Sequence, residues 1–391
     1  MSIYQYILKY FFTLNMLLLR NMERNIMFVL FIVAFLGLLW IGAHVGIVFL
    51  KSSGILGKIG SSIAYVIALI MPLLMAGSML VGNGEWNSIN SIVYTFSSTW
   101  IVILSGFFFS TVLIWFISAV LQKLGISFPA AYSGYIVLIL TVTFAGYGIT
   151  NASNIKIKNT KLSEGKLPSE LSNKRIALIS DLHIGLVRKK YFVAKVTRKI
   201  MKEKPDMILI AGDLIDGPKF PYQEFLSPLS ELSAPLGVYF TPGNHEGYNT
   251  ENELFYAAIP KNITVVIDEV VSIPGTSQTL VGFDYLLPED EVMFKDRIDV
   301  VTKGSKPSIA ILHDPKNRGS LGKAGIPLTV SGHTHGGQFF PGTLMVKLLY
   351  KEKISGLVEH ITGDYYTTTG VGTAVSPARV GTDAEIVILE S

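Results

Sequence analysis

The residues of this chain that could bind metal ions occur in five short groups. The groups read Asp181-Leu182-His183, Gly212-Asp213, Gly243-Asn244-His245-Glu246, His313-Asp314 and Gly332-His333-Thr334-His335. Carboxylate, imidazole and amide oxygen are suitable ligands for divalent ions such as Mn²⁺, Fe²⁺ and Zn²⁺. The chain has no cysteine, which excludes thiol catalysis and cysteine-bound zinc. Five of the seven histidines lie in these groups, so the sequence predicts a metal centre built from them.

Each group follows a short run rich in Val, Ile, Leu or aromatic residues, which is typical of a buried strand. These runs are 175–180, 207–211, 238–241, 308–312 and 328–331, and similar runs are 264–267, 279–283, 365–369 and 385–389. Residues 191–204 have the apolar spacing of a helix. In open α/β sheets, ligands bind outside the carboxyl ends of the strands. We therefore expect an α/β domain of two packed mixed β-sheets flanked by helices, with the metal centre at the ends of the strands.

The same residues suggest two metal ions rather than one. Asp213 can use both carboxylate oxygens to bridge a pair of ions. Two ions about 3.5–4 Å apart can bind a phosphate, activate a water and stabilise the leaving oxygen. One such group alone is often only a turn or a packed histidine, but all five in order after strands indicate phosphoester chemistry.

The order DLH, GDLID, GNHE, HD and GHTH resembles the calcineurin-like metallophosphoesterase superfamily. The stretch GHTHGGQ and the tail GVGTAVSPAR with EIVIL are similar to its YkuE-type, membrane-anchored bacterial branch. The resemblance covers about residues 174–391. One departure is Ala384, where that branch usually has proline before the terminal Glu-Ile.

The resemblance implies a role for each residue and a direct attack of metal-activated hydroxide on phosphorus. His245 would stabilise the phosphate or protonate the leaving group, and Asp216 would orient a loop or a ligand histidine. The metal ligands would be Asp181, His183 and His335 for the first ion, Asn244, His313 and His333 for the second, and Asp213 for both.

The N-terminal part of the chain has a different composition. Residues 1–150 contain six basic and two acidic side chains, whereas charged residues make up 16% of the whole chain. About 20 apolar residues cross a bilayer as a helix. The stretches long enough to span without a charged residue are Met27–Leu50, Ser61–Gly82, Trp100–Leu121 and Ala131–Thr150. A fifth apolar segment, Ile3–Leu19, carries Lys9 and could either span or lie at the interface.

We therefore predict a multi-pass domain of the cell membrane over residues 1–150, a linker over 151–173 and the phosphoesterase domain over 174–391. Lysine and arginine in the short loops favour a cytoplasmic position for the phosphoesterase domain. Six basic residues lie near its side of the membrane and three on the other side. The net charge of +4 is too small to indicate nucleic acid as a partner.

An apolar run, Phe339–Tyr350, follows the last metal-binding group. It is either a core-packed hairpin or helix, or an apolar lip that faces the bilayer. A lip favours a lipid-linked phosphate ester or pyrophosphate as the substrate. The alternatives are a tethered phosphodiesterase for soluble nucleotides and a non-catalytic membrane sensor. Other nearby residues also have open roles. Arg188-Lys189-Lys190 could meet a substrate phosphate or an anionic headgroup, or form a solvated start to the next helix. Arg379 could hold an anionic substrate or a carboxylate, and Glu246 could tune His245 or cap a turn.

Overall fold

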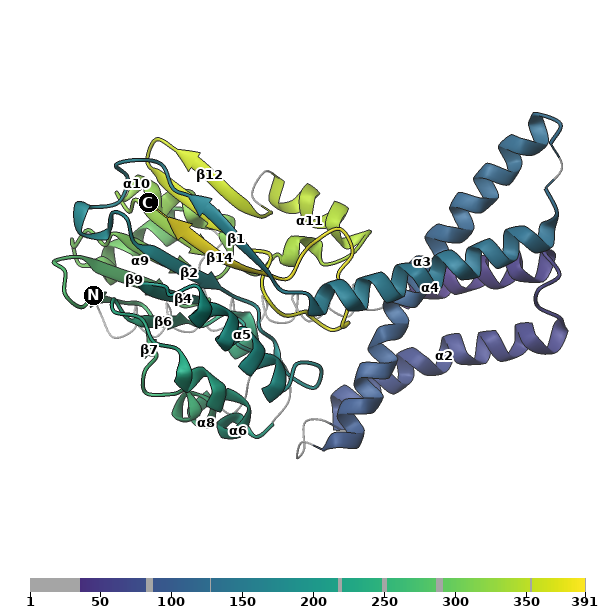
Figure 1. The fold of residues 1–391 in the computed structure, drawn as a ribbon, viewed down its shortest axis with the longest axis horizontal. Helices are drawn as coiled ribbons and strands as arrows, with labels where there is room; N and C mark the ends of the chain where they lie inside the picture. Colours follow the sequence, from purple (N-terminus) through teal and green to yellow (C-terminus); the bar gives the residue numbers. More distant parts are fainter. Residues whose placement is uncertain are drawn as a thin grey trace, which may run out of the picture. The chain divides into compact units, whose positions relative to one another are not determined.

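The computed structural model describes residues 36–81, 87–126, 128–216, 220–247, 252–285, 291–351 and 354–390 (Figure 1). The chain divides into two compact units. One is Met1–Pro72 with Leu104–Thr141, and the other is Leu73–Ile103 with Val142–Ser391. The second unit therefore combines an α/β domain with parts of three apolar helices of the N-terminal region.

The described part of the N-terminal region is helical. A helix is the form in which an apolar segment can satisfy its backbone polar groups in lipid, where no water is available. The helices are Leu36–Ser52, α2 (Lys58–Val81), α3 (Ser88–Lys123) and α4 (Ala130–Ser153). The last three are long and apolar enough to cross a membrane. They match three of the predicted spans, although α3 begins at Ser88 rather than Trp100. Only the end of the predicted span Met27–Leu50 is described, and Ile3–Leu19 lies outside the described residues.

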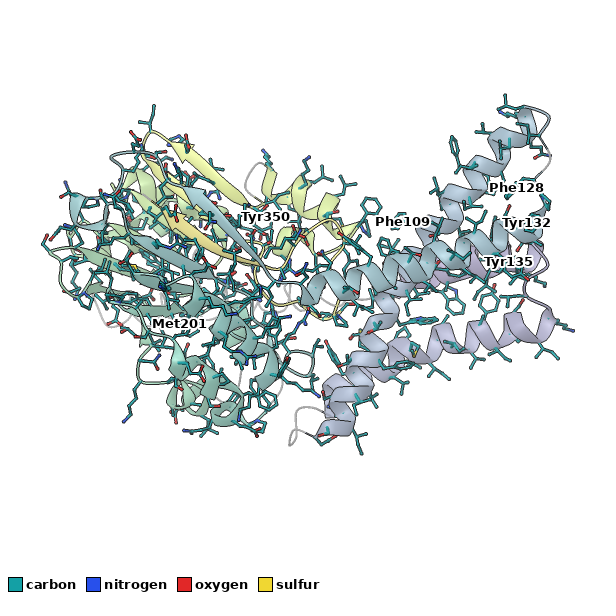
Figure 2. All side chains as sticks on the ribbon, in the orientation of Figure 1. Phe109, Phe128, Tyr132, Tyr135, Met201 and Tyr350 are labelled. Carbon is teal, nitrogen blue, oxygen red and sulfur yellow. The ribbon has the colours of Figure 1, made fainter. Side chains whose placement is uncertain are left out.

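Aromatic side chains gather where α4 begins. Phe128, Tyr132 and Tyr135 are all exposed, and the rings of Phe128 and Tyr132 are 6.4 Å apart between centroids (Figure 2). Such aromatic groups at the end of an apolar helix are typical of a membrane–water interface.

The α/β domain contains two six-stranded mixed sheets, as predicted. The order of the first sheet is β1 (Lys156–Lys161), β14 (Glu385–Glu390), β2 (Arg175–Ile179), β4 (Met207–Ala211), β6 (Val238–Thr241) and β7 (Thr264–Val265). The order of the second sheet is β12 (Gly356–His360), β13 (Gly363–Thr367), β11 (Leu328–Ser331), β10 (Ile309–Leu312), β9 (Thr279–Phe283) and β8 (Glu269–Ser272). A short parallel pair, β3 (Ile184–Gly185) with β5 (Ile215–Asp216), joins two of the loops that follow the first sheet.

Three apolar clusters hold these layers together. Leu178 and Leu209 of the first sheet share a buried cluster with Ile309 and Val330 of the second. The other face of the first sheet packs on helices that include α5 (Lys190–Lys202), α6 (Tyr222–Leu226) and α8 (Asn252–Ala258). The other face of the second sheet packs on α9 (Glu291–Thr302) and α10 (Arg318–Lys323). The central strands are buried on both faces, so their carboxyl ends are held rigidly.

The segment 151–173, which we expected to be a linker, is part of the α/β domain. Its strand β1 pairs in parallel with β14, with Lys156 opposite Glu385. Leu162, Leu167 and Leu171 then enter the cluster between the two sheets. The sequence did not indicate this strand, because KIKNTK is polar, as the sequence of an edge strand can be.

The end of α4 is fixed to the α/β domain by hydrogen bonds to its last turn. Arg188 Nη2 donates to the carbonyl of Ala152 at 3.2 Å, and Lys195 Nζ donates to that of Ser153 at 2.7 Å. Asn151 Nδ2 donates to the carbonyl of Thr382 at 2.8 Å. Basic side chains stabilise a helix C-terminus because its last carbonyls have no partner within the helix.

The apolar run after the last metal-binding group forms an exposed helix, α11 (Gly342–Tyr350), which contains no buried residue (Figure 1). Its apolar side chains do not enter the core, so of the two interpretations of this run the core-packed one is wrong.

Candidate metal centre

The carboxyl ends of the central strands bring the five groups together. Asp181 follows β2, Asp213 follows β4, Asn244 follows β6, His313 follows β10 and His333 follows β11. The backbone bends sharply at these points. Positive φ angles of 48° to 72° occur at Asp181, His183, Asp213, His333 and His335. Residues other than glycine rarely adopt this conformation, and where they do it often marks a functional site.

Three overlapping sets of side chains have ligand atoms within 4.8 Å of one another. The sets are Asp181 with His183 and His335, His183 with Asp213 and His245, and Asp213 with His313 and His333. The first set contains the three residues predicted for one ion alone, and the third contains His313, His333 and Asp213. Asp213 also belongs to the second set, together with His245, which was not predicted as a ligand. Its Oδ2 lies 3.1 Å from His313 Nε2 and 3.8 Å from His183 Nε2.

The polar atoms of these side chains fit the binding of divalent metal. Asn244 Oδ1 and His313 Nε2 are buried and have no hydrogen-bond partner. His313 Nδ1 donates to the carbonyl of Ala211 at 2.7 Å, which leaves the lone pair of Nε2 directed at the centre. His183 Nε2 and His335 Nε2 face each other at 2.9 Å. Buried polar atoms normally find partners. The unpartnered Asn244 Oδ1 and His313 Nε2 therefore fit the coordination of a cation.

The protonation states of Asp213 and His335 favour metal binding. Burial raises the pKa of Asp213, but the neighbouring His313, His245 and His183 outweigh it and hold the pKa well below its usual range. Burial and the nearby His183 keep the pKa of His335 well below its usual range. Asp213 is therefore an anion and His335 a neutral imidazole, which are the forms that bind metals.

His245 and Asp216 form a pair beside the predicted ligands. His245 Nδ1 lies 3.0 Å from Asp216 Oδ1, and His183 Nδ1 lies 3.7 Å from the same oxygen. Asp216 therefore contacts His245 more closely than the ligand histidine that the sequence suggested. The ring of His245 packs edge-on against that of His183, with 4.6 Å between centroids. This places the imidazole of His245 at the centre.

Glu246 fixes the loop that carries Asp213. Its buried carboxylate accepts hydrogen bonds from the backbone N–H groups of Asp213 at 3.0 Å, Leu214 at 2.8 Å and Ile215 at 3.0 Å. It also accepts one from Gly243 N at 2.6 Å. This contact adds to the two roles considered for Glu246, and the sequence did not indicate it, because three of the four partners are backbone groups about 30 residues earlier in the chain.

Arg379 is fully buried and holds the loops of the centre, so it is not placed to bind a substrate. Its Nη2 donates to the carbonyls of Thr369 and Gly372, both at 2.7 Å. Its Nη1 donates to the carbonyl of His335 at 3.3 Å. Arg188, which could also have met a substrate, is buried with its guanidinium 4.6 Å from the centre of the Phe192 ring.

Two glycines leave space that the ligand side chains occupy. A Cβ at Gly243 would lie 2.2 Å from Asp213 Oδ1, and one at Gly212 would lie 2.4 Å from His313 Nδ1. No side chain fits at such distances. These glycines therefore allow the close packing of two loops around the centre.

Aromatic and charged side chains border the His333 side of the centre. The rings of Tyr285 and Tyr350 lie 6.4 Å and 6.2 Å from that of His333. Lys316 Nζ lies 3.5 Å from Asp314 Oδ2 and 5.8 Å from the centre of the Tyr350 ring. Sequence reasoning missed the two tyrosines, because isolated tyrosines carry no spacing signal.

Comparison with known proteins supports the family assignment. The family model described as calcineurin-like phosphoesterase matches residues 174–337. An uncharacterized metallophosphoesterase of Helicobacter pylori is 35% identical over 239 residues, which cover 60% of this chain and 63% of the relative. One of Campylobacter jejuni is 30% identical over 261 residues, covering 64% of this chain and 67% of the relative.

The chain therefore belongs to the calcineurin-like phosphoesterase family. A zebrafish protein named transmembrane protein with metallophosphoesterase domain is 28% identical over 267 residues, covering 64% of this chain and 60% of the relative. The chain spans 63% of the length of the Helicobacter relative. Assignment to the YkuE-type branch stays a prediction.

Proposed function

We propose that this chain is a membrane-anchored phosphoester hydrolase that uses two divalent ions, which are Mn²⁺, Fe²⁺, Zn²⁺ or similar metals. The observation that carries the proposal is the position of Asp213 Oδ2 near one predicted ligand of each ion, 3.8 Å from His183 Nε2 and 3.1 Å from His313 Nε2. A shared carboxylate holds two ions close enough to act on one phosphate. The family match supports the same chemistry.

Asp181, His183 and His335 would hold one ion, and Asn244, His313 and His333 the other. Two ions bound there would supply positive charge for the phosphoryl oxygens and lower the pKa of an attacking water. His245 lies beside the ligands and carries a proton that Asp216 stabilises, so it donates to the leaving oxygen. Glu246 and Arg379 keep the ligand loops in place by binding backbone groups.

The membrane part acts as an anchor. The helices α2, α3 and α4 have the length and composition of spans, and the zebrafish relative is named a transmembrane protein. The distribution of lysine and arginine in the short loops supports a cytoplasmic position for the phosphoesterase domain.

The proposed substrate is a lipid-linked phosphate ester or pyrophosphate. Support comes from α11, whose apolar side chains are exposed and whose last residue, Tyr350, contacts His333. A soluble nucleotide has no acyl chain that could contact this apolar surface.

A panel assay of the full chain in detergent with Mn²⁺ tests the proposal. The panel contains bis-p-nitrophenyl phosphate, nucleotides and lipid phosphates. We expect hydrolysis of the chromogenic diester and faster hydrolysis of a lipid phosphate. Asp299→Asn, at an exposed position on α9, should behave like the unchanged protein. Two bound ions without turnover of any compound would instead indicate a ligand-binding sensor, and a preference for nucleotides would indicate a tethered soluble-substrate enzyme.

A further inference from the structure

The exposed apolar side chains of α11 form one continuous stripe. Leu344 and Leu348 are one helical turn apart, as are Met345 and Leu349. The two residues of the second turn, Leu348 and Leu349, are 71% and 75% exposed. Residues four apart lie on the same face of a helix. The four side chains therefore form one continuous apolar face of α11 rather than scattered exposed residues.

The other face of α11 is joined to the metal centre. Tyr350 contacts the ring of His333 at 6.2 Å between centroids. The helix follows the loop of His335 without a break, and Met345 N donates to the carbonyl of Pro341 at 3.1 Å. The position of the stripe is consequently fixed relative to the predicted metal ligands.

Hydrogen bonds also connect this segment to the end of α4. Val380 N donates to the carbonyl of Gln338 at 2.9 Å, four residues before α11. Arg379 N, next to it, donates to the carbonyl of Gly148 in α4 at 2.9 Å. Two hydrogen bonds therefore connect the segment just before α11 to the C-terminal part of α4.

We propose that α11 is an interfacial helix that lies in the surface layer of the bilayer spanned by α4, with its stripe against the acyl chains. A helix with a large apolar face and a basic residue binds a membrane surface in this way. Lys347 is the only charged residue within α11, and it would lie at the lipid phosphates. The metal centre would then open at the level of the lipid headgroups.

This inference rests on the membrane anchoring of the proposed function but not on its catalysis. A second copy of the chain or another of its own segments could also cover the stripe. The path from α11 to α4 favours lipid, because it connects the segment just before α11 to a helix that is apolar enough to span.

Site-directed spin labelling tests the inference directly, because the chain contains no cysteine. A nitroxide is attached at Leu348→Cys in the full chain, reconstituted in vesicles of phosphatidylcholine and phosphatidylglycerol. Val300→Cys on α9 is the matched control, since Val300 is also 71% exposed. Val66→Cys on α2 reports on the anchoring. Collision of each label with oxygen and with a water-soluble nickel chelate is then measured.

We expect the label at 348 to collide with oxygen and to be shielded from nickel, as the label at 66 is, whereas the label at 300 collides with nickel. Access of nickel to 348 would show that the stripe faces water and would overturn the inference. Shielding from both reagents with an immobilised spectrum would show that protein covers the stripe, and would overturn it as well. If the label at 66 itself meets nickel, the anchoring proposal fails instead.

Discussion

His245 and Asp216 are held together at 3.0 Å between Nδ1 and Oδ1, on two loops that follow neighbouring strands of the first sheet. Burial lowers the pKa of His245. The hydrogen bond to Asp216 and the charges of Asp213, Asp216 and Glu246 outweigh that effect and raise the pKa to about 9. His245 is therefore protonated at neutral pH, which suits a group that donates a proton to a leaving oxygen.

Replacing Asp216 should move the alkaline limit of activity. The protonated form of His245 is present below its pKa, so the rate should fall as the pH rises through that value. Asp216→Asn removes the negative charge that raises the pKa, and an opposite charge at this distance is typically worth about 1–3 pH units. We expect the alkaline limb of kcat/KM for the chromogenic diester to move to lower pH. An unchanged limb at unchanged metal content would exclude the pair as the titrating unit.

Removing the imidazole of His245 should lower the rate without removing an ion. His245→Ala should lose roughly 10²–10⁴-fold in kcat, the usual contribution of a positioned acid or base. Elemental analysis should still find both ions, because the predicted ligands are other residues. Loss of one ion would show that His245 is itself a ligand.

Asp213→Asn should abolish activity and lower the metal content. Asp213 is the carboxylate shared between two ligand sets, and an amide has neither the charge nor the second anionic oxygen. Turnover and metal content are measured on the same preparation. Near-normal turnover with two bound ions would refute the shared-ligand assignment.

A methyl group at Gly243 should displace the same carboxylate. The added Cβ would lie 2.2 Å from Asp213 Oδ1, so Gly243→Ala should lose bound metal and activity. Gly319→Ala on α10 is the control, because a Cβ there has no neighbour within 4 Å. Equal metal content in the two variants would mean that the loops can move apart freely.

The soluble fragment must begin earlier than the sequence suggested. The sequence predicts residues 174–391 as the phosphoesterase domain, but a fragment with those bounds lacks β1 and the buried side chains of Leu162, Leu167 and Leu171. Each large apolar side chain contributes about 1.5–3 kcal/mol when buried. A fragment of residues 154–391 should therefore be monomeric and take up metal, while 174–391 should aggregate. Gel filtration and metal analysis of both fragments distinguish the outcomes.

The strands and the loops at their ends could be predicted because their signals are local. Each predicted ligand follows directly after an apolar run, and a strand that is buried on both faces must be apolar. This is why the positions of Asp181, Asp213 and His313 at the ends of β2, β4 and β10 agree with expectation. Their roles as ligands remain predictions.

The supporting contacts could not be predicted, because they join distant parts of the chain through the backbone. Glu246 binds N–H groups about 30 residues away, and Arg379 binds carbonyls that carry no residue-specific signal. For α11, composition could not distinguish the two interpretations, because a core helix and a helix that faces the bilayer have equally apolar sequences. Only the structure shows which side of the helix lacks neighbours.

The capped end of α4 has a consequence for how the enzyme meets its substrate. Arg188 and Lys195 bind the last carbonyls of α4, and β1 begins three residues after the helix ends. A catalytic domain on a flexible tether would sample a range of heights above the bilayer. If α4 spans a membrane as we propose, the hydrogen bonds at its end would hold the metal centre at one height, and a phosphorus atom would have to reach that height to react. The search for substrate would then be two-dimensional, and a phosphoester bond above or below that plane would not be cleaved.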